Sequence, residues 1–237
     1  MAKSLHVCWL LDDWKASREQ YLRAWVAAGW SVVLWHGGQL AATPVVGVEL
    51  RLADNVVFDS PIERSFAYEE RHKNHGGCAD LFRYQILCEL GGCYSDLDVL
   101  PGRNTTPSLF DTRAIPGFDR SWFPRVNPLT LAWSMEIRFI FTPAPQHPLL
   151  STLRDTAVRN TESFIDAGGY TKNGIDNLLA RTGPLMAKNT VQRYALEQHV
   201  HLNTFLLPDV IQSTTLENCK EHYTDKQPEI RRVAGIL

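Results

Sequence analysis

The sequence predicts an α/β fold, because strand-like and helix-like segments alternate from the N-terminus onward. Residues 5–11 are a nearly continuous apolar run of strand length, the type that is buried on both faces in a parallel sheet. Residues 14–28 then place apolar side chains at helical spacing and stop at Gly29, and residues 31–35 are a second, valine-rich strand. This strand–helix–strand order predicts the crossover unit that opens a Rossmann-like half.

The next segments are shorter. No glycine-rich phosphate-binding fingerprint follows the first strand, so the sequence favours neither a dinucleotide-binding nor an ATP-binding protein. Residues 41–58 hold short valine-rich pieces between turn-forming residues, which predict short strands or extended loops. Residues 62–72 predict a helix with one charged side.

The most informative stretch runs from residue 75 to residue 103. The glycine pair at 76–77 predicts a turn, and residues 78–90 predict a helix with one buried stripe. The apolar side chains of that stripe are Ala79, Phe82, Ile86, Leu87 and Leu90. A second glycine pair at 91–92 ends the helix, because glycine adopts a positive φ at little cost.

Four charged residues in this stretch suggest chemistry. A short strand after the second glycine pair carries Asp96 and Asp98, whose side chains would leave the same side of an extended chain. Two adjacent carboxylates disfavour joint ionisation unless a divalent cation lies between them. Asp80 and Arg83 lie three residues apart on the helix and share one surface. Taken singly, a solvated turn and a surface salt bridge remain open as alternatives.

The order of these parts resembles a known family. The segments that carry the resemblance are Ala79-Asp80-Leu81-Phe82-Arg83-Tyr84, Gly91-Gly92-Cys93-Tyr94 and Asp96-Leu97-Asp98. They are similar to the DXD sugar-binding region of nucleotide-sugar glycosyltransferases, in the group of yeast-type mannosyltransferases, capsular polysaccharide transferases and large glucosylating toxins. The departures, at Cys78, Ala79, Cys93 and Ser95, leave every charged position intact.

The resemblance implies a GT-A-like fold in a single domain, residues 1–237. Residues 1–103 would form the nucleotide-sugar-binding half, with a mixed central sheet flanked by helices. Residues 104–237 would form the acceptor-side half and the C-terminal tail. The implied activity is metal-dependent hexosyl transfer from a UDP- or GDP-sugar with retention of configuration, in polysaccharide or glycoconjugate synthesis. The acceptor could be a glycan, a lipid, a small molecule or a protein.

The resemblance also implies roles for single residues. Asp98 is expected to bind Mn²⁺ or Mg²⁺ directly, and Asp96 to contact ribose and sugar hydroxyls or the metal through water. Asp80 and Arg83 are expected to hold the donor sugar. In the toxin branch the aromatic residue at the position of Trp9 stacks on the uracil base, whereas a core role for Trp9 is the alternative.

Family members complete the metal site with a residue near the C-terminus. His222 is the favoured equivalent, with Asp225 and Asn218 as alternatives. The His-aromatic…Ser-Trp ending that is usual in the family is absent, so the closure of this site is not determined by the sequence.

The second half of the chain predicts further helices and strands. Residues 131–141 alternate in part like a strand, and residues 148–165 predict a long helix. Helical segments are also expected at 176–181 and 185–198, separated by Thr182-Gly183-Pro184, and a short strand at 205–207. A Thr-Gly-Pro before such a helix recurs in the resembled family.

Composition limits the class of protein. A formal net charge of −2 argues against a nucleic-acid partner, and no apolar run is long enough to cross a membrane. The N-terminal residues lack a secretory signal, and an odd number of cysteines, five, is consistent with reduced thiols. We therefore expect a cytoplasmic protein.

Two other functions compete with glycosyl transfer. An Asp-x-Asp phosphotransferase would place its aspartates after the first strand and would need a later lysine and acidic pair. A non-catalytic sugar-nucleotide-binding module would match the same fold, although Asp80, Arg83, Asp96 and Asp98 are all intact. The set His72, His75 and Cys78 is spaced evenly, but a zinc site would need a fourth ligand.

Overall fold

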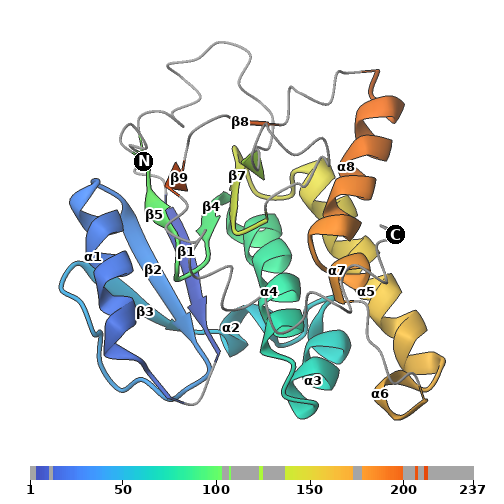
Figure 1. The fold of residues 1–237 in the computed structure, drawn as a ribbon, viewed down its shortest axis with the longest axis horizontal. Coiled ribbons are helices and arrows are strands. Elements are labelled where there is room, and N and C mark those ends of the chain that lie inside the picture. The colour runs from blue at the N-terminus through green and yellow to red at the C-terminus, as the bar shows by residue number, and fades with distance from the viewer. Residues whose placement is uncertain are drawn as a thin grey trace, which may run out of the picture.

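A mixed sheet forms the centre of the fold in the computed structural model, which describes residues 4–10, 13–102, 107, 123–124, 137–172, 178–199, 206–207 and 211–212. Within these residues the sheet has five strands in the order β3-β2-β1-β4-β7 (Figure 1). The strands are β1 (Ser4–Trp9), β2 (Ser31–His36), β3 (Val48–Leu52), β4 (Gly92–Ser95) and β7 (Phe139–Thr142). Strands β1 to β4 pair in parallel, whereas β7 is antiparallel to β4.

The first elements form the strand–helix–strand unit that the sequence predicts. β1 lies parallel to β2, with Leu5 opposite Val32 and Val7 opposite Leu34. A 3-10 turn, η1 (Ala16–Arg18), and helix α1 (Glu19–Ala27) connect the two strands, and the chain turns at Gly29 with φ +86°. β1 ends at Trp9, two residues before the end of the apolar run.

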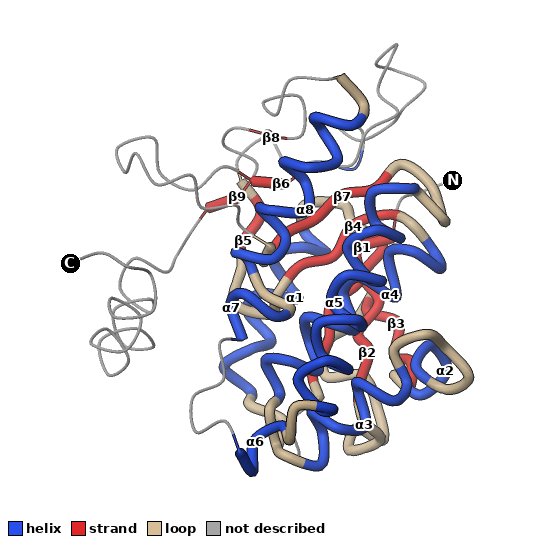
Figure 2. The backbone as a smooth tube through the Cα atoms, turned by 90° about the vertical axis from the view of Figure 1, so that its right-hand side faces the viewer, coloured by secondary structure: helices blue, strands red, loops and turns tan. Residues whose placement is uncertain are grey.

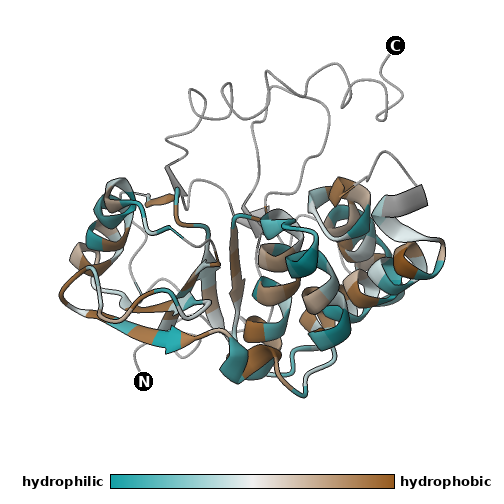
Figure 3. Cartoon of the chain, turned by 90° about the horizontal axis from the view of Figure 1, so that it is seen from below, coloured by the Kyte–Doolittle hydropathy of each residue, from teal (hydrophilic) through white to brown (hydrophobic). Residues whose placement is uncertain are grey.

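Alternate residues of β2 point to opposite faces of the sheet, and different helices cover the two faces. Val32 and Leu34 share a buried cluster with Trp25 of α1. Val33 and Trp35 share the other cluster with residues of helix α4 (His75–Leu90). Figure 2 shows α4 and helix α5 (Pro148–Asp166) in front of β1 and β4. In Figure 3 hydrophobic residues lie along the central strands and the helices beside them.

The segment after β3 contains two short helices, α2 (Asp54–Val57) and α3 (Glu63–Arg71). The helix expected at 62–72 is confirmed. The expectation of strand or extended loop is wrong at α2, because the Phe58 N–H donates to the Asp54 carbonyl at 3.0 Å and closes a helical turn. This turn buries Val56 and Val57 against the core.

Helix α4 begins earlier than the sequence predicts. It starts at His75, and the Asn74 side chain caps it by accepting a hydrogen bond from the Gly77 N–H at 3.3 Å. The expected turn at 76–77 is therefore wrong, because both glycines lie in the first helical turn. Glycine is required at 77 for space, since a Cβ there would lie 2.7 Å from Oε2 of the buried Glu69.

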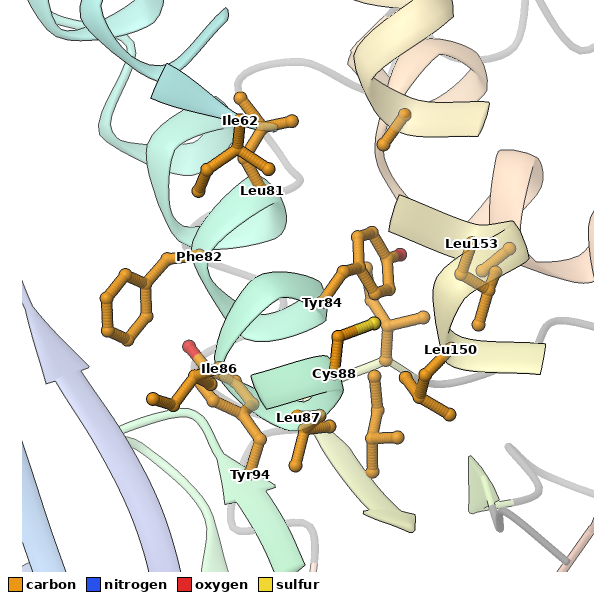
Figure 4. Packing of buried hydrophobic residues seen from close by; sticks show 14 of the residues in the cluster. Ile62, Leu81, Phe82, Tyr84, Ile86, Leu87, Cys88, Tyr94, Leu150 and Leu153 are labelled. Carbon is orange, nitrogen blue, oxygen red and sulfur yellow. The ribbon is translucent and has the colours of Figure 1, made fainter. Parts of the chain in front are cut away.

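Helix α4 is buried on more than one side. It packs between the sheet and helix α5, so the expected single stripe describes only part of its contacts (Figure 4). The expectation is wrong for Leu90, which is exposed at the end of the helix. Phe82 and Ile86 lie in the same buried cluster as Trp35 and Tyr94, and Leu150 and Leu153 of α5 complete that cluster. Burial on both sides of the middle of α4 explains why its polar residues Asp80 and Arg83 are also shielded from solvent.

The second glycine pair ends α4 and starts β4, as predicted. Gly91 has φ +68° and Gly92 has φ +87°. A Cβ at Gly92 would lie 2.7 Å from the Ser4 carbonyl oxygen on the neighbouring strand, so no larger residue fits there. β4 stops at Ser95, and the Val99 N–H donates to the Asp96 carbonyl at 3.3 Å. The expected strand at 96–98 is thus replaced by a turn, and the same-side argument for the two aspartates fails.

The rest of the described chain is mainly helical. Its helices are α5 (Pro148–Asp166), α6 (Gly169–Lys172), α7 (Leu178–Arg181) and α8 (Pro184–Glu197). Two strand pairs are added by β5 (Leu100–Pro101) with β9 (Ile211–Gln212) and β6 (Phe123–Pro124) with β8 (Leu206–Leu207). The long helices expected at 148–165 and 185–198 are confirmed.

Other expectations reach beyond what is described. The strand expected at 131–141 is seen as β7 from Phe139, and its first six residues lie outside the described part. The division of the domain at residue 103 stays a prediction. No helix within the described ranges has the length and hydropathy that crossing a bilayer requires.

Candidate functional site

The topology of the sheet places the candidate site. The chain proceeds from β1 to β2 and β3 on one side, whereas β4 lies on the other side of β1. In such sheets ligands bind outside the carboxyl ends of the strands, at the point where the strand order reverses. Trp9 ends β1 and Ser95 ends β4 at this edge, so Asp96 and Asp98 follow directly at the switch point.

Arg83 brings two of the predicted site residues together. Its Nη2 lies 3.2 Å from Asp80 Oδ1 and 3.2 Å from Asp96 Oδ1. Its other nitrogens are held by the backbone, with Nη1 donating to the Ile137 carbonyl at 2.7 Å and Nε to the Ala79 carbonyl at 3.2 Å. The guanidinium is therefore fixed in a buried position between the helix and the end of β4.

The Asp80 carboxylate is held from two sides. Oδ1 pairs with Arg83, and Oδ2 accepts a hydrogen bond from the Thr182 hydroxyl at 2.9 Å. Burial raises the pKa of Asp80, and Arg83 and the Thr182 hydroxyl oppose that rise. Burial also disfavours the charge on Arg83, yet Asp96, Tyr94 and Asp80 outweigh it and hold the pKa of Arg83 well above its usual range.

Asp96 is the more open of the two carboxylates, with 23% of its side chain exposed. Its Oδ1 accepts a hydrogen bond from the Tyr94 hydroxyl at 3.0 Å as well as the contact with Arg83. The Tyr94 hydroxyl also lies 3.1 Å from Cys8 Sγ, and the Arg83 guanidinium lies 4.9 Å from the centre of the Tyr94 ring. Burial raises the pKa of Tyr94, so the phenol stays protonated and can donate.

Asp98 lies in the turn after Asp96 and is partly exposed, between the buried residues Leu97 and Val99. Carboxylate oxygens suit a hard divalent cation, so the donor chemistry of Asp96 and Asp98 fits Mn²⁺ or Mg²⁺. Within the ranges that the structure describes, however, no three acidic, histidine or cysteine side chains converge on a common point. The remaining ligands would come from the diphosphate, from water or from residues outside those ranges.

Trp9 is buried at the carboxyl end of β1. Its Nε1 donates to the Asp13 carbonyl at 3.2 Å, and its ring packs edge-on against Trp14 with centroids 5.6 Å apart. It belongs to the same buried cluster as Trp25. The position of Trp9 at the switch point agrees with a core role and with stacking on a base. The stacking role stays a prediction.

Other sequence candidates are not part of this site. His222, Asp225 and Asn218 lie outside the described residues. His72 is exposed beside the Tyr68 carbonyl, whereas Cys78 is buried in the core. The described residues thus contain no zinc cluster around this set.

Two residues of the site were missed by the reasoning from sequence. Tyr94 is assigned no role within the segment that carries the resemblance, whereas its hydroxyl donates a hydrogen bond to Asp96. Thr182 is named from the sequence only as part of the Thr-Gly-Pro segment between two helices, whereas its hydroxyl contacts Asp80, 102 positions earlier in the chain. The Thr182-Gly183-Pro184 motif was the one available signal, since a spacing argument cannot join residues so distant in sequence.

Part of the chain matches one known family model. Residues 28–116 match the family model of the glycosyltransferase sugar-binding region containing a DXD motif. The matched segment includes Asp80, Arg83, Asp96 and Asp98. The resemblance to DXD glycosyltransferases is confirmed. None of the curated proteins matches this chain in sequence.

Solved structures show the same fold. The catalytic domain of alpha-toxin from Clostridium novyi aligns with TM-score 0.69 and 10% identity, over 98% of this chain and 82% of that one. The UDP-bound glycosyltransferase domain from the YGT toxin gives 0.63 and 10%, over 91% and 81%. PaToxG glycosyltransferase gives 0.59 and 13%, over 85% and 73%. These similarities confirm the GT-A-like α/β fold.

Proposed function

We propose that this chain is a metal-dependent glycosyltransferase that moves a sugar from a nucleotide-diphosphate sugar to an acceptor hydroxyl with retention of configuration. The observation that carries the proposal is the contact of Arg83 with both Asp80 and Asp96 at the switch point of the sheet. A buried arginine shared between two carboxylates at this edge is a preformed polar surface for a sugar and its phosphates.

The donor sugar would lie against the helix side of this surface. Asp80 would accept hydrogen bonds from the hydroxyls of the sugar. Arg83 and Thr182 hold its carboxylate in one orientation for these contacts. Arg83 opposes the rise that burial causes in the pKa of Asp80, and it adds positive charge where the phosphate approaches. The fixed geometry lowers the cost of ordering these groups when the donor binds.

The diphosphate would lie beside the turn that follows β4. Asp98 would hold the divalent ion directly, and Asp96 would contact it through water or contact the ribose. When bound, Mn²⁺ or Mg²⁺ supplies charge neutralisation for the departing nucleoside diphosphate. Trp9 would support the base from the end of β1. A UDP-sugar is the first donor to test, because the YGT toxin domain binds UDP.

A donor-hydrolysis assay tests the proposal directly. The protein is incubated with UDP-glucose, UDP-galactose, UDP-N-acetylglucosamine and GDP-mannose in the presence of Mn²⁺, and the free nucleoside diphosphate is measured. Release from one donor, lost on removal of the metal with a chelator, supports the proposal. NMR of the product sugar then reports whether the anomeric configuration is retained.

The same assay separates the competing functions. Binding of a donor without release of nucleoside diphosphate, even with an acceptor library, would indicate a binding module. Release of inorganic phosphate or transfer of a phosphoryl group would indicate a phosphotransferase. Neither outcome is expected, because the ion pair of Asp80 and Arg83 lies within the segment that matches the DXD sugar-binding region.

A further inference from the structure

A residue from the other half of the chain completes the contacts that hold the Asp80 carboxylate in the proposed site. Thr182 lies between α7 and α8, is fully buried and donates its hydroxyl hydrogen to Asp80 Oδ2 at 2.9 Å. Asp80 Oδ1 contacts Arg83 at 3.2 Å, so the two oxygens of the carboxylate are held by different elements. A carboxylate held at both oxygens has one defined orientation.

Thr182 is itself fixed by several contacts. Its carbonyl accepts a hydrogen bond from the Tyr84 hydroxyl at 3.0 Å, and its N–H donates to the Leu178 carbonyl at 3.0 Å. The next residue, Gly183, packs so closely that a Cβ would lie 3.0 Å from Leu179 Cα. The backbone around Thr182 therefore has little freedom to move.

The residue before Thr182 anchors this turn in the core. Arg181 contacts Glu69 through Nη1 and donates to the Tyr170 hydroxyl through Nη2 at 2.9 Å. Glu69 Oε2 also accepts hydrogen bonds from Asn74 at 2.6 Å and from Tyr170 at 2.8 Å. Asn74 caps the helix that carries Asp80. The same buried network thus holds both the turn of Thr182 and the start of α4.

We propose that Thr182 is a positioning residue, which orients the Asp80 carboxylate for the donor sugar from a turn anchored by Arg181 and Glu69. This inference rests on the proposed function and adds a specific requirement to it. Thr182 need not touch the substrate. Its hydroxyl fixes where the carboxylate oxygens lie when the sugar hydroxyls approach them.

The test compares Thr182→Val, which has nearly the same shape but no hydroxyl, with Thr182→Ser, which keeps the hydroxyl. Thr182→Val removes the hydroxyl that donates a hydrogen bond to a buried carboxylate oxygen. This loss should lower kcat/KM for hydrolysis of the sugar nucleotide by about 10- to 100-fold. Thr182→Ser should restore most of that loss. The affinity for UDP alone, measured by titration calorimetry, should stay within about threefold in both variants, since under the proposed function Asp80 contacts the sugar, which UDP lacks.

A matched control removes a hydroxyl elsewhere in the core. Thr190 of α8 is also buried, and its hydroxyl contacts Met186 of the same helix at 3.4 Å. Thr190→Val makes the same chemical change away from the site, so kcat/KM should remain within about twofold of the unmodified protein. Thermal unfolding of all variants reports any general loss of stability.

Two results would overturn the inference. One is unchanged kcat/KM in Thr182→Val, and the other is a parallel loss of affinity for UDP and for the UDP-sugar, which would indicate a general structural role. If the unmodified protein releases no nucleoside diphosphate and binds no donor, the proposed function itself has failed. Ligand-free crystal structures then decide about Thr182: a displaced Asp80 carboxylate in Thr182→Val supports positioning, and an unmoved one contradicts it.

Discussion

Two buried arginines, Arg83 on α4 and Arg181 at the end of α7, show how similar ion pairs can serve different purposes. In the Glu69 cluster (Glu69, Asn74, Tyr170 and Arg181), the carboxylate is fully buried, and both of its oxygens accept hydrogen bonds from the protein. In the Arg83 cluster (Asp80, Arg83, Tyr94 and Asp96), the arginine is as buried, but the Asp96 side chain is 23% exposed. The first cluster is closed, and the second opens at the carboxyl edge of the sheet.

This difference suggests that the two clusters have different roles, one in stability and one in turnover. A closed pair with all partners in place contributes to a defined fold, and losing one partner leaves a buried charge uncompensated. An open pair keeps carboxylate surface available at an edge where ligands bind. We therefore expect changes in the Glu69 cluster to appear mainly in stability and changes in the Arg83 cluster mainly in turnover.

The largest expected effect breaks the closed cluster. Arg181→Ala removes the cation beside Glu69, which is fully buried. We expect the free energy of unfolding to fall by about 3–5 kcal/mol, measured by urea denaturation. The exposed Arg64, which pairs with Glu162 and Asp166, is the control, and Arg64→Ala should cost less than about 0.5 kcal/mol. Equal losses in the two variants would remove the distinction between closed and exposed pairs.

The next prediction concerns the open side of the site. Asp98→Asn should lower metal-dependent release of nucleoside diphosphate by about 10²–10³-fold, because under the proposed function the ion that stabilises the leaving group would lose its direct ligand. The free energy of unfolding should change by less than about 0.5 kcal/mol. Asp166→Asn, at an exposed position 69% accessible in its side chain, is the matched control for turnover. Unchanged rates in Asp98→Asn would exclude Asp98 as a metal ligand.

The stabilities of these variants must be compared at a pH above the range in which His6 titrates. This side chain is buried in β1, its Nδ1 accepts a hydrogen bond from Trp35, and burial lowers its pKa to about 4. Between that value and the ordinary 6.5, the unfolded chain binds a proton that the folded chain excludes. Stability should therefore fall by about 3 kcal/mol as the pH falls through this range. The pH dependence should be weaker in His6→Gln, and an identical dependence would contradict the assignment.

The smallest effect concerns the support of Asp96. Tyr94→Phe removes the hydroxyl that donates to Asp96 Oδ1 at 3.0 Å but keeps the ring beneath Arg83. We expect a loss of about 3- to 10-fold in kcat/KM for donor hydrolysis, close to the value of one hydrogen bond. Full activity in this variant would mean that Arg83 alone fixes Asp96.

Much of the fold could be predicted from local patterns. The first strand–helix–strand unit, the glycine pair at 91–92 and the helices at 148–165 and 185–198 follow from periodicity and glycine conformation. The start of α4 could not, because it depends on the Asn74 cap and on the contact of Gly77 with Glu69. The turn at Asp96 was missed, since nothing in the sequence shows where strand pairing ends.

The site was predictable in its charges but not in its support. Asp80, Arg83 and Asp96 are named from the family resemblance as well as from their spacing, and the fold brings all three together. Thr182 and Tyr94 act through hydroxyl groups whose partners depend on the tertiary packing of distant elements. Such contacts have no short-range pattern, so sequence reasoning identifies the groups that carry charge more readily than those that hold them.

The most direct test of the account is a crystal structure with UDP and Mn²⁺. The anomalous signal of manganese should lie beside Asp98, with the diphosphate at the carboxyl ends of β1 and β4 and the empty sugar position next to Asp80 and Arg83. An ion bound elsewhere, or a nucleotide away from this edge of the sheet, would contradict the proposed site.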